Sequence, residues 1–322
     1  MTVERRPGIV RRAEFGFGSC ARLARIVGEL PPGPIVLLGS RSLDKSQREN
    51  LEQVGGVHFD LHLTTHPGEE GRDRSQLRAE LARVKASVVV ACGGGAVMDA
   101  AKAVSRPGPP ALVLVPVTLS GSEHTANTAY WEAGEKRVAV VGYADAVIAD
   151  PDMIVRVRRI LDPGALHAIA HALATLSIST SGWLNRSMAK AALTDLISAL
   201  EAEESSPHVR LRYLRGAWMA AIGFAVTGPK IGKHHRLVHR YARPREHALF
   251  SARLLCSALL NSDWYSVPLK ELAQSSSRLD VSLRRIAERW LPTVASVGLR
   301  DDRDGGVTAN DWGHEELMEI LA

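Results

Sequence analysis

A short apolar run that ends in three glycines constrains the fold of this chain more than any other segment. Residues 88–91 are apolar and mostly β-branched, residues 93–95 are glycines, and an alanine-rich stretch with helical character continues to Lys102. A strand that turns into a helix through glycines leaves backbone N–H groups uncovered at the positive end of the helix dipole. The segment therefore predicts a strand, a tight turn and a helix, with a turn that can bind a pyrophosphate. The alternative is a purely structural turn.

Strand-like and helix-like segments alternate through the first half of the chain. Strand-like runs lie at residues 35–38, 57–63, 88–91 and 111–115, and helical patterns lie at 47–54 and 76–84. Residues 138–141 and 146–149 are interpreted as an additional hairpin or strand pair. The alternation predicts an α/β fold with a mostly parallel sheet, in which ligands bind at the carboxyl ends of the strands.

The pattern changes after about residue 152, where helical periodicity replaces strand-like runs. Asp162 and Pro163 together indicate the start of a helix, with a capping acid followed by proline in the first turn. Apolar residues then repeat at helical spacing, at Leu211, Leu214, Trp218, Ile222 and Ala225. We therefore expect an α/β dinucleotide-binding domain over residues 1–152 and an all-helical catalytic or metal-binding domain over residues 153–322.

Composition narrows the classes of partner. Hydrophobic residues make up 45% and charged residues 23% of 322 residues, so the chain can bury a large core. The net charge of +5 comes from scattered arginines, which favours small anionic ligands over nucleic acid. The sequence contains no apolar run long enough to span a bilayer, so no membrane partner is expected.

Cysteine usage and the first residues of the sequence indicate a compartment. The three cysteines, Cys20, Cys92 and Cys256, are far apart, odd in number and contain no CxxC pair. This argues against a disulfide framework or a thiolate zinc site and fits a reducing compartment. Residues 1–12 lack the apolar core of a signal peptide. We expect a cytoplasmic protein.

Histidines gather in the helical half in two pairs with a spacing of four residues. The pairs are His167 with His171 and His235 with His239, while His234 and His247 lie close to the second pair in sequence. This spacing places both imidazoles of a pair on one face of a helix. Paired imidazoles can bind a divalent metal or shuttle protons, although single helical histidines are more often structural.

A loop rich in hydroxyls follows the strand-like run at 111–115. Residues 116–123 contain Thr118, Ser120 and Ser122 together with a glycine. Short hydroxyl side chains and backbone N–H groups can hold a phosphate, a ribose or a carboxamide. The alternative is an ordinary capped turn that leads into a helix.

Taken in order, these segments resemble the iron-containing alcohol dehydrogenase and dehydroquinate synthase superfamily. The matching features are Phe15-Gly16-Phe17-Gly18, the Gly-Gly-Gly-x-x-x-Asp-x-x-Lys turn at 93–102, the loop at 116–123, Asp150-Pro151, and His-His-x-x-x-His at 234–239. The Ser-Gly-Ser-Glu form of the loop, Gly216-Ala217-Trp218 and the doubled histidine are similar to the maleylacetate reductase branch. The resemblance covers nearly the whole chain.

This resemblance implies a dehydroquinate synthase-like fold, with the active site in a cleft between the two domains. NADH or NADPH would lie on the glycine turn of the first domain. The implied cofactor-binding residues are Gly39, Gly93, Gly94, Gly95, Asp99, Thr118, Ser122 and Lys136. A homodimer is also implied, and the apolar helical face at 254–260 fits a packing surface.

The resemblance further implies a metal site and a proton donor in the second domain. The implied ligands of a divalent metal, Fe or Zn, are His167, His171, His235 and His247. His239 would donate the proton in the cleft, with His235 as a second catalytic residue. The implied chemistry is hydride transfer to a carbonyl or conjugated double bond of a small oxygenated acid.

The chain departs from the family pattern at two places. His167 stands where the alcohol dehydrogenases have an aspartate and many maleylacetate reductases an asparagine, so zinc suits the position as well as iron, or the metal has been lost. The segment from His239 to His247 is short, basic and without glycines. We expect Arg243 or Arg245 there to bind a substrate carboxylate, and a solvated basic loop is the alternative.

The choice between the two cofactors depends on the residues after the first long strand. Gly39-Ser40-Arg41-Ser42 contains no acid that could bind a ribose 2′-hydroxyl, while Arg41 and the serines could accept a 2′-phosphate. This slightly favours NADPH over NADH.

The sequence thus predicts an NAD(P)H-dependent reductase of a small oxygenated or unsaturated carboxylic acid. One alternative is a repurposed non-redox enzyme on the same fold, of the lyase or cyclase type found in specialised metabolism. The other is an inactive scaffold or binding subunit.

Overall fold

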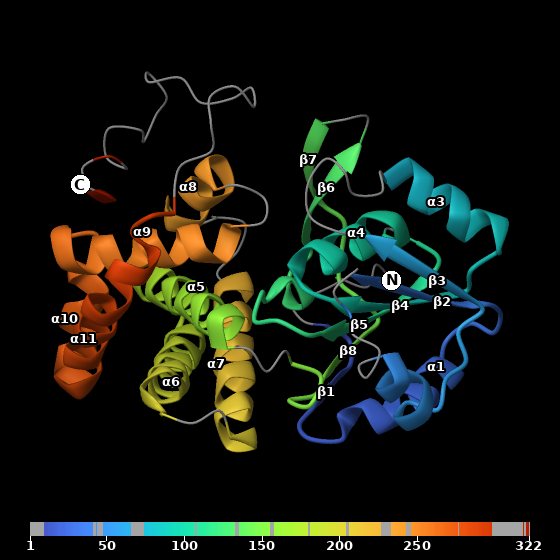
Figure 1. The fold of residues 1–322 in the computed structure, drawn as a ribbon, viewed down its shortest axis with the longest axis horizontal. Helices are drawn as coiled ribbons and strands as arrows, with labels where there is room; N and C mark the ends of the chain where they lie inside the picture. The colour runs from blue at the N-terminus through green and yellow to red at the C-terminus, as the bar shows by residue number, and fades with distance from the viewer. Residues whose placement is uncertain are drawn as a thin grey trace, which may run out of the picture. The chain divides into compact units, whose positions relative to one another are not determined.

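The protein divides into two compact units, Met1–Arg156 and Val157–Ala322, which are described separately (Figure 1). The computed structural model describes residues 10–40, 43, 48–65, 74–106, 108–132, 135–154, 158–179, 181–203, 206–226, 233–242, 246–275, 277–297, 318, 320 and 321. The domain boundary expected from the sequence, between residues 152 and 153, stays a prediction.

The first unit contains a six-stranded parallel sheet in the order β1-β8-β5-β4-β2-β3. Its strands are β1 Ala13–Phe15, β2 Ile35–Ser40, β3 Leu61–Thr65, β4 Val88–Gly93, β5 Ala111–Pro116 and β8 Ala146–Ala149. The helical segments between them are η1 Ser19–Arg22, α1 Leu23–Gly28, η2 Asn50–Val54, α3 Arg74–Arg83, α4 Gly95–Ser105 and η3 Ser122–His124. The alternation of strands and helices predicted the parallel sheet correctly.

The apolar run at 88–93 forms the buried middle of this sheet. All six residues of β4 are buried, and alternate side chains enter two different hydrophobic clusters. Val88 and Val90 pack with Leu37 on one face, while Val89 packs with Met98 of α4 on the other. A strand covered on both faces needs apolar residues at every position, which explains the continuous run.

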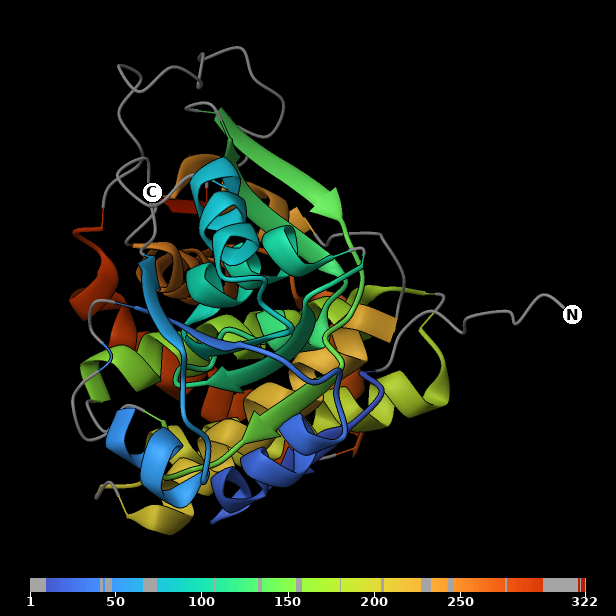
Figure 2. The same cartoon turned by 90° about the vertical axis from the view of Figure 1, so that its right-hand side faces the viewer.

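The pairing of the two last strand-like segments differs from the sequence interpretation. Residues 138–140 belong to β7, Glu135–Val140, which pairs antiparallel with β6, Asn127–Glu132, in a hairpin that packs on α3 and α4 (Figure 2). Residues 146–149 form β8, which lies between β1 and β5. The expected pairing of 138–141 with 146–149 is therefore wrong. Burial is the reason, because β8 is wholly buried while Val138 and Val140 are exposed.

The described residues of the second unit contain helices and no strand. The helices are α5 Arg158–Ser177, α6 Trp183–Glu201, α7 Pro207–Val226, α8 Lys233–Tyr241, α9 His247–Asn261, α10 Ser266–Ser275 and α11 Ser277–Val294. α6 packs along α7, and α5 packs against α6, α7 and α9. A Cβ at Gly216 would lie 2.7 Å from Leu196 Cγ, so a glycine is required where α7 approaches α6. This unit matches the all-helical prediction.

The helix start expected at Asp162 and Pro163 is wrong. Both residues lie inside α5, which already includes Arg158. Asp162 is buried, and its carboxylate accepts hydrogen bonds from Tyr213 Oη and Arg158 Nε. The acid therefore satisfies a buried phenol and an arginine instead of capping a helix.

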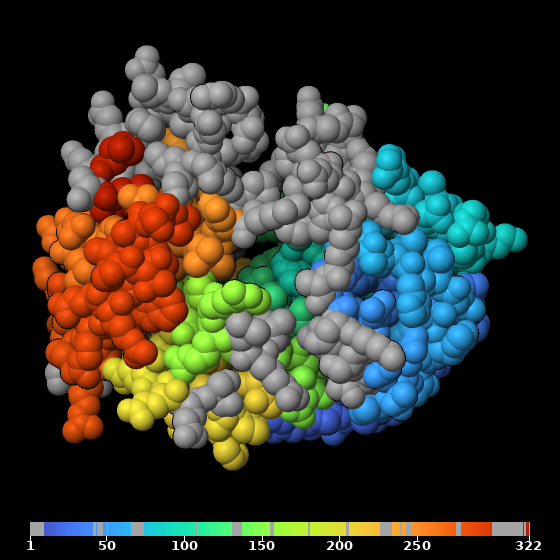
Figure 3. Space-filling view, in the orientation of Figure 1, coloured from blue at the N-terminus to red at the C-terminus, as the bar shows by residue number. Residues whose placement is uncertain are grey.

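Two further findings concern apolar helices. The apolar face of α9, which was expected to support a homodimer, is buried within the unit at Leu254, Leu255, Ala258 and Leu259. The homodimer itself stays a prediction, because α9 is explained as a core helix. The helices α10 and α11 form an outer face of this unit (Figure 3).

Across the part of the chain that the structure describes, no helix is both long and apolar enough to cross a bilayer.

Candidate active site

The glycine turn of the first unit is an uncapped helix start. β4 ends at Gly93, Gly94 is the N-cap residue with an extended backbone, and α4 begins at Gly95 without a side-chain cap. The first backbone N–H groups of a helix have no acceptor within that helix. These donors lie at the carboxyl end of β4, beside β5, where parallel sheets bind their ligands. The turn therefore has the backbone chemistry to hold a pyrophosphate.

The loop at 116–123 packs directly against this turn. A Cβ at Gly94 would lie 3.1 Å from Thr118 Oγ1, and a Cβ at Gly95 would lie 3.1 Å from Ser120 Cβ. These close approaches explain why both positions are glycine. Thr118, an expected cofactor contact, thus lies beside the N-cap of α4.

A fully buried lysine holds the loop in place. Lys102 Nζ lies 2.9 Å from both Ser122 O and Ser122 Oγ, and 3.0 Å from Asp99 Oδ1. The Asp99 carboxylate also accepts hydrogen bonds from Ser122 Oγ and the Ala129 N–H. Asp99 and Ser122 therefore fix the loop, and their direct contact with a cofactor stays a prediction. Sequence reasoning gave Lys102 no separate role, although its spacing from Asp99 is that of a helical ion pair.

A second buried pair follows in the same loop. Glu123 and His124 are both buried, and His124 Nε2 lies 3.7 Å from Glu123 Oε1. Burial raises the pKa of Glu123 to about 7, partly opposed by its own backbone hydrogen bond and by Lys102. Burial lowers the pKa of His124 to about 3. Glu123 therefore changes charge near neutral pH, which the sequence alone did not indicate.

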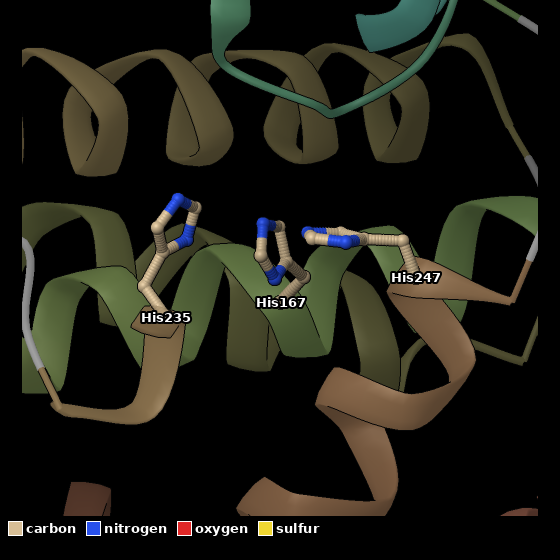
Figure 4. Close-up of side chains that lie close together, drawn as sticks. All are labelled: His167, His235 and His247. Atoms are coloured by element: carbon tan, nitrogen blue, oxygen red, sulfur yellow. The ribbon is translucent and has the colours of Figure 1, made fainter. Parts of the chain in front are cut away.

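Three helices of the second unit bring histidines into one cluster. His167 of α5, His235 of α8 and His247 of α9 each offer a ring nitrogen, and these nitrogens all lie within 4.8 Å of one another (Figure 4). His171 also joins the cluster, with its ring centroid 4.5 Å from that of His167. The structure thus unites the four expected metal ligands, three of them with the spacing of a metal site.

Burial keeps the imidazoles of His167 and His171 neutral. It lowers the pKa of His167 to about 3, helped by His235, and holds the pKa of His171 well below its ordinary value. A neutral imidazole keeps the lone pair that a metal requires. Among the described residues, this cluster contains no carboxylate. Three imidazoles fit a divalent ion such as zinc or iron and leave a coordination position open.

A chain of buried hydrogen bonds continues from the cluster into the core. His171 Nε2 lies 3.0 Å from His167 Nε2, and His167 Nδ1 lies 2.7 Å from Ser251 Oγ. Ser251 Oγ lies 2.9 Å from His234 Nε2, and His234 Nδ1 lies 2.9 Å from Tyr265 Oη. Sequence reasoning missed Ser251 and Tyr265, because no spacing relates them to the histidines.

Several expected site residues are only partly described. The backbone of His239 lies in α8 and that of Lys136 in β7, but their side chains lie outside the described structure. Arg41, Ser42, Arg243 and Arg245 lie outside the described residues altogether. Gly39 is in β2, where it pairs with Cys92 of β4, and a Cβ there would lie 3.1 Å from Leu43. The roles of these residues stay predictions.

Comparison with known proteins agrees with this architecture. A family model described as iron-containing alcohol dehydrogenase matches residues 11–151. Maleylacetate reductase 1 of Cupriavidus pinatubonensis is 28% identical over 307 residues, which are 90% of this chain and 85% of that protein. Maleylacetate reductase 1 of Rhodococcus opacus is 28% identical over 238 residues, 71% of this chain and 65% of that protein.

A solved structure has a similar fold. The crystal structure of maleylacetate reductase from Agrobacterium tumefaciens superposes with a TM-score of 0.77 at 22% identity, covering 97% of this chain and 95% of that one. The match over residues 11–151 is therefore to the iron-containing alcohol dehydrogenase family, and the fold of the chain is similar to that of a maleylacetate reductase. The curated relatives named above are maleylacetate reductases, which confirms the resemblance inferred from the sequence.

Proposed function

We propose that the protein is an NAD(P)H-dependent reductase of a small oxygenated or unsaturated carboxylic acid, of the maleylacetate reductase type. The observation that carries this proposal is the convergence of His167, His235 and His247 within 4.8 Å in the helical unit. A chain that had kept only the fold would have no physical reason to bring several imidazoles together in a partly buried cluster, because burying polar groups is costly.

The nucleotide part of the proposal belongs to the first unit. The uncapped start of α4 at Gly93, Gly94 and Gly95 would hold the pyrophosphate of NADH or NADPH, with Thr118 beside it. Lys102 and Asp99 would keep the loop at 116–123 in the shape that this turn needs. When bound, the dihydronicotinamide supplies the hydride.

The proton and metal part belongs to the second unit. His167, His235 and His247 would hold a divalent ion, which when bound polarises a substrate oxygen. His239 would donate a proton to the reduced substrate, and Arg243 or Arg245 would bind its carboxylate. His171 completes the expected set of four ligands, and His235 is also the second expected catalytic residue. A cytoplasmic homodimer is part of the same proposal.

The test is a titration of metal-analysed protein with NADH and, separately, with NADPH, followed by turnover with keto-acids and enones. We expect micromolar binding of at least one cofactor and loss of the nicotinamide absorbance during turnover. Conversion of a substrate without change in that absorbance would favour the non-redox alternative. Failure to bind either cofactor would contradict the proposal.

A further inference from the structure

The buried hydrogen-bond chain beside the histidine cluster has a direction. We propose that Tyr265, His234 and Ser251 are positioning residues that set the tautomer of His167 and so limit its availability to a metal ion. The inference rests on the proposed metal site, and it adds residues that limit metal binding there.

The hydroxyl of Tyr265, at one end of this series of hydrogen bonds, sets their direction. Tyr265 is buried, and among the described residues its hydroxyl has one hydrogen-bond partner, His234 Nδ1 at 2.9 Å. A buried hydroxyl hydrogen without an acceptor costs free energy. Tyr265 therefore donates to His234, and His234 Nδ1 accepts.

The donor and the acceptor of each further hydrogen bond then follow one after another. A neutral imidazole carries one hydrogen, so His234 carries it on Nε2 and donates to Ser251 Oγ. Ser251 is left to donate its own hydrogen to His167 Nδ1 at 2.7 Å. His167 then carries its hydrogen on Nε2, which faces His171 Nε2 at 3.0 Å. Burial lowers the pKa of both His167 and His234 to about 3, which agrees with neutral rings.

This tautomer does not suit metal binding. His167 Nδ1 accepts from Ser251, and His167 Nε2 carries a hydrogen where a metal needs a lone pair. Binding through Nε2 requires the chain to reverse, so that His167 donates to Ser251, Ser251 to His234, and His234 to Tyr265. Each imidazole then moves its hydrogen from Nε2 to Nδ1, both hydroxyls rotate, and no group changes charge. The Tyr265 hydrogen would lose the acceptor that it has among the described residues.

The first experiment measures Zn²⁺ affinity of the metal-free protein by competition with a chromophoric chelator. Tyr265→Phe removes the hydrogen that fixes the direction, so we expect about tenfold tighter Zn²⁺ binding than in the wild type. Tyr213→Phe is the matched control, because Tyr213 is a buried tyrosine of the same unit whose hydroxyl bonds Asp162 instead. Its affinity should equal that of the wild type.

A double-mutant cycle separates the chain from general packing effects. Ser251→Ala disconnects Tyr265 from His167, so Tyr265→Phe should have no further effect on Zn²⁺ affinity in that background. A full effect of Tyr265→Phe in the Ser251→Ala background would overturn the inference. Unchanged or weaker Zn²⁺ binding by Tyr265→Phe alone would also overturn it.

A second readout needs no metal. Long-range ¹H–¹⁵N correlation spectra of metal-free, histidine-labelled protein report which ring nitrogen carries the hydrogen. We expect Nε2–H for both His167 and His234, and Nδ1–H for both would overturn the inference. If neither wild type nor Tyr265→Phe binds Zn²⁺, the proposed metal site fails together with the predicted affinity change. If the wild type binds Zn²⁺ and the spectra show Nδ1–H, the inference fails alone.

Discussion

The two units build their candidate sites in opposite ways. In the first unit the glycine turn uses backbone N–H groups, and the residues that form it are consecutive in sequence. In the second unit the cluster uses side chains from three separate helices, α5, α8 and α9. The contrast teaches that a backbone site is as robust as the strand and helix around it, whereas a side-chain site depends on how several helices pack.

The two units also differ in the charge state of their buried side chains. The first unit buries a lysine, Lys102, that pairs with the partly exposed Asp99, and it surrounds the pair with hydrogen-bond partners from residues 122–129. The second unit buries imidazoles that stay neutral. The first arrangement stabilises a loop, while the second avoids burying charge beside the proposed metal site. The following experiments test this difference.

The largest effect is expected from His239→Ala. Loss of a general acid lowers turnover by about 10²- to 10⁴-fold, whereas NADPH binding, assigned to the other unit, should not change. Steady-state kinetics and a fluorescence titration measure the two properties. Normal turnover by this variant would contradict the assignment of His239.

Lys102→Met should strongly destabilise the first unit. It leaves the Asp99 carboxylate without its buried partner, and breaking a buried ion pair costs about 3–5 kcal/mol of unfolding free energy. Arg83→Ala is the matched control, because Arg83 forms the same i,i+3 pair with Glu80 at an exposed position and should cost less than about 1 kcal/mol. Urea unfolding measures both, and equal effects would refute the structural role of Lys102.

Glu123→Gln should change how stability depends on pH. The pKa of Glu123 is raised in the folded state, so its contribution to the free energy of unfolding is full below pH 4.5 and is lost as pH rises through about 7. Glutamine does not titrate and has no such loss. Between pH 4.5 and pH 8 the free energy of unfolding of the variant should therefore rise by about 2–3 kcal/mol relative to that of the wild type. Glu80→Gln, at a more exposed position of α3, serves as the control. Parallel stability curves for wild type and Glu123→Gln would contradict this account.

The smallest effect is expected at the glycine turn. Gly94→Ala places a Cβ 3.1 Å from Thr118 Oγ1, so the turn and loop must shift and NADPH binding should weaken by about tenfold, or ~1.4 kcal/mol. Gly28→Ala has no atom within 4 Å of the new Cβ and is the control. Zn²⁺ affinity should not change in either variant. Unaltered NADPH affinity in Gly94→Ala would contradict the proposal that the glycine turn binds the cofactor.

The same contrast explains what the sequence could predict. Residues 88–102 predicted strand, turn and helix because all the determinants are local. Residues 138–149 were paired wrongly, because strand partners are chosen by burial and not by adjacency. The histidine pairs were visible from their spacing, but their neighbours Ser251 and Tyr265 were not. Those contacts arise where α9 packs against α5 and α8, and where Tyr265, just before α10, meets His234 of α8, which no sequence periodicity encodes.

The central claim is that the chain has two independent ligand sites, a nucleotide site in the first unit and a metal site in the second. The most direct measurement compares wild type with the triple variant His167→Ala, His235→Ala and His247→Ala, by titrating each with Zn²⁺ and with NADPH. The account predicts that the variant loses Zn²⁺ binding and turnover but keeps its affinity for NADPH. Retained Zn²⁺ binding, or loss of NADPH binding in a folded variant, would contradict it.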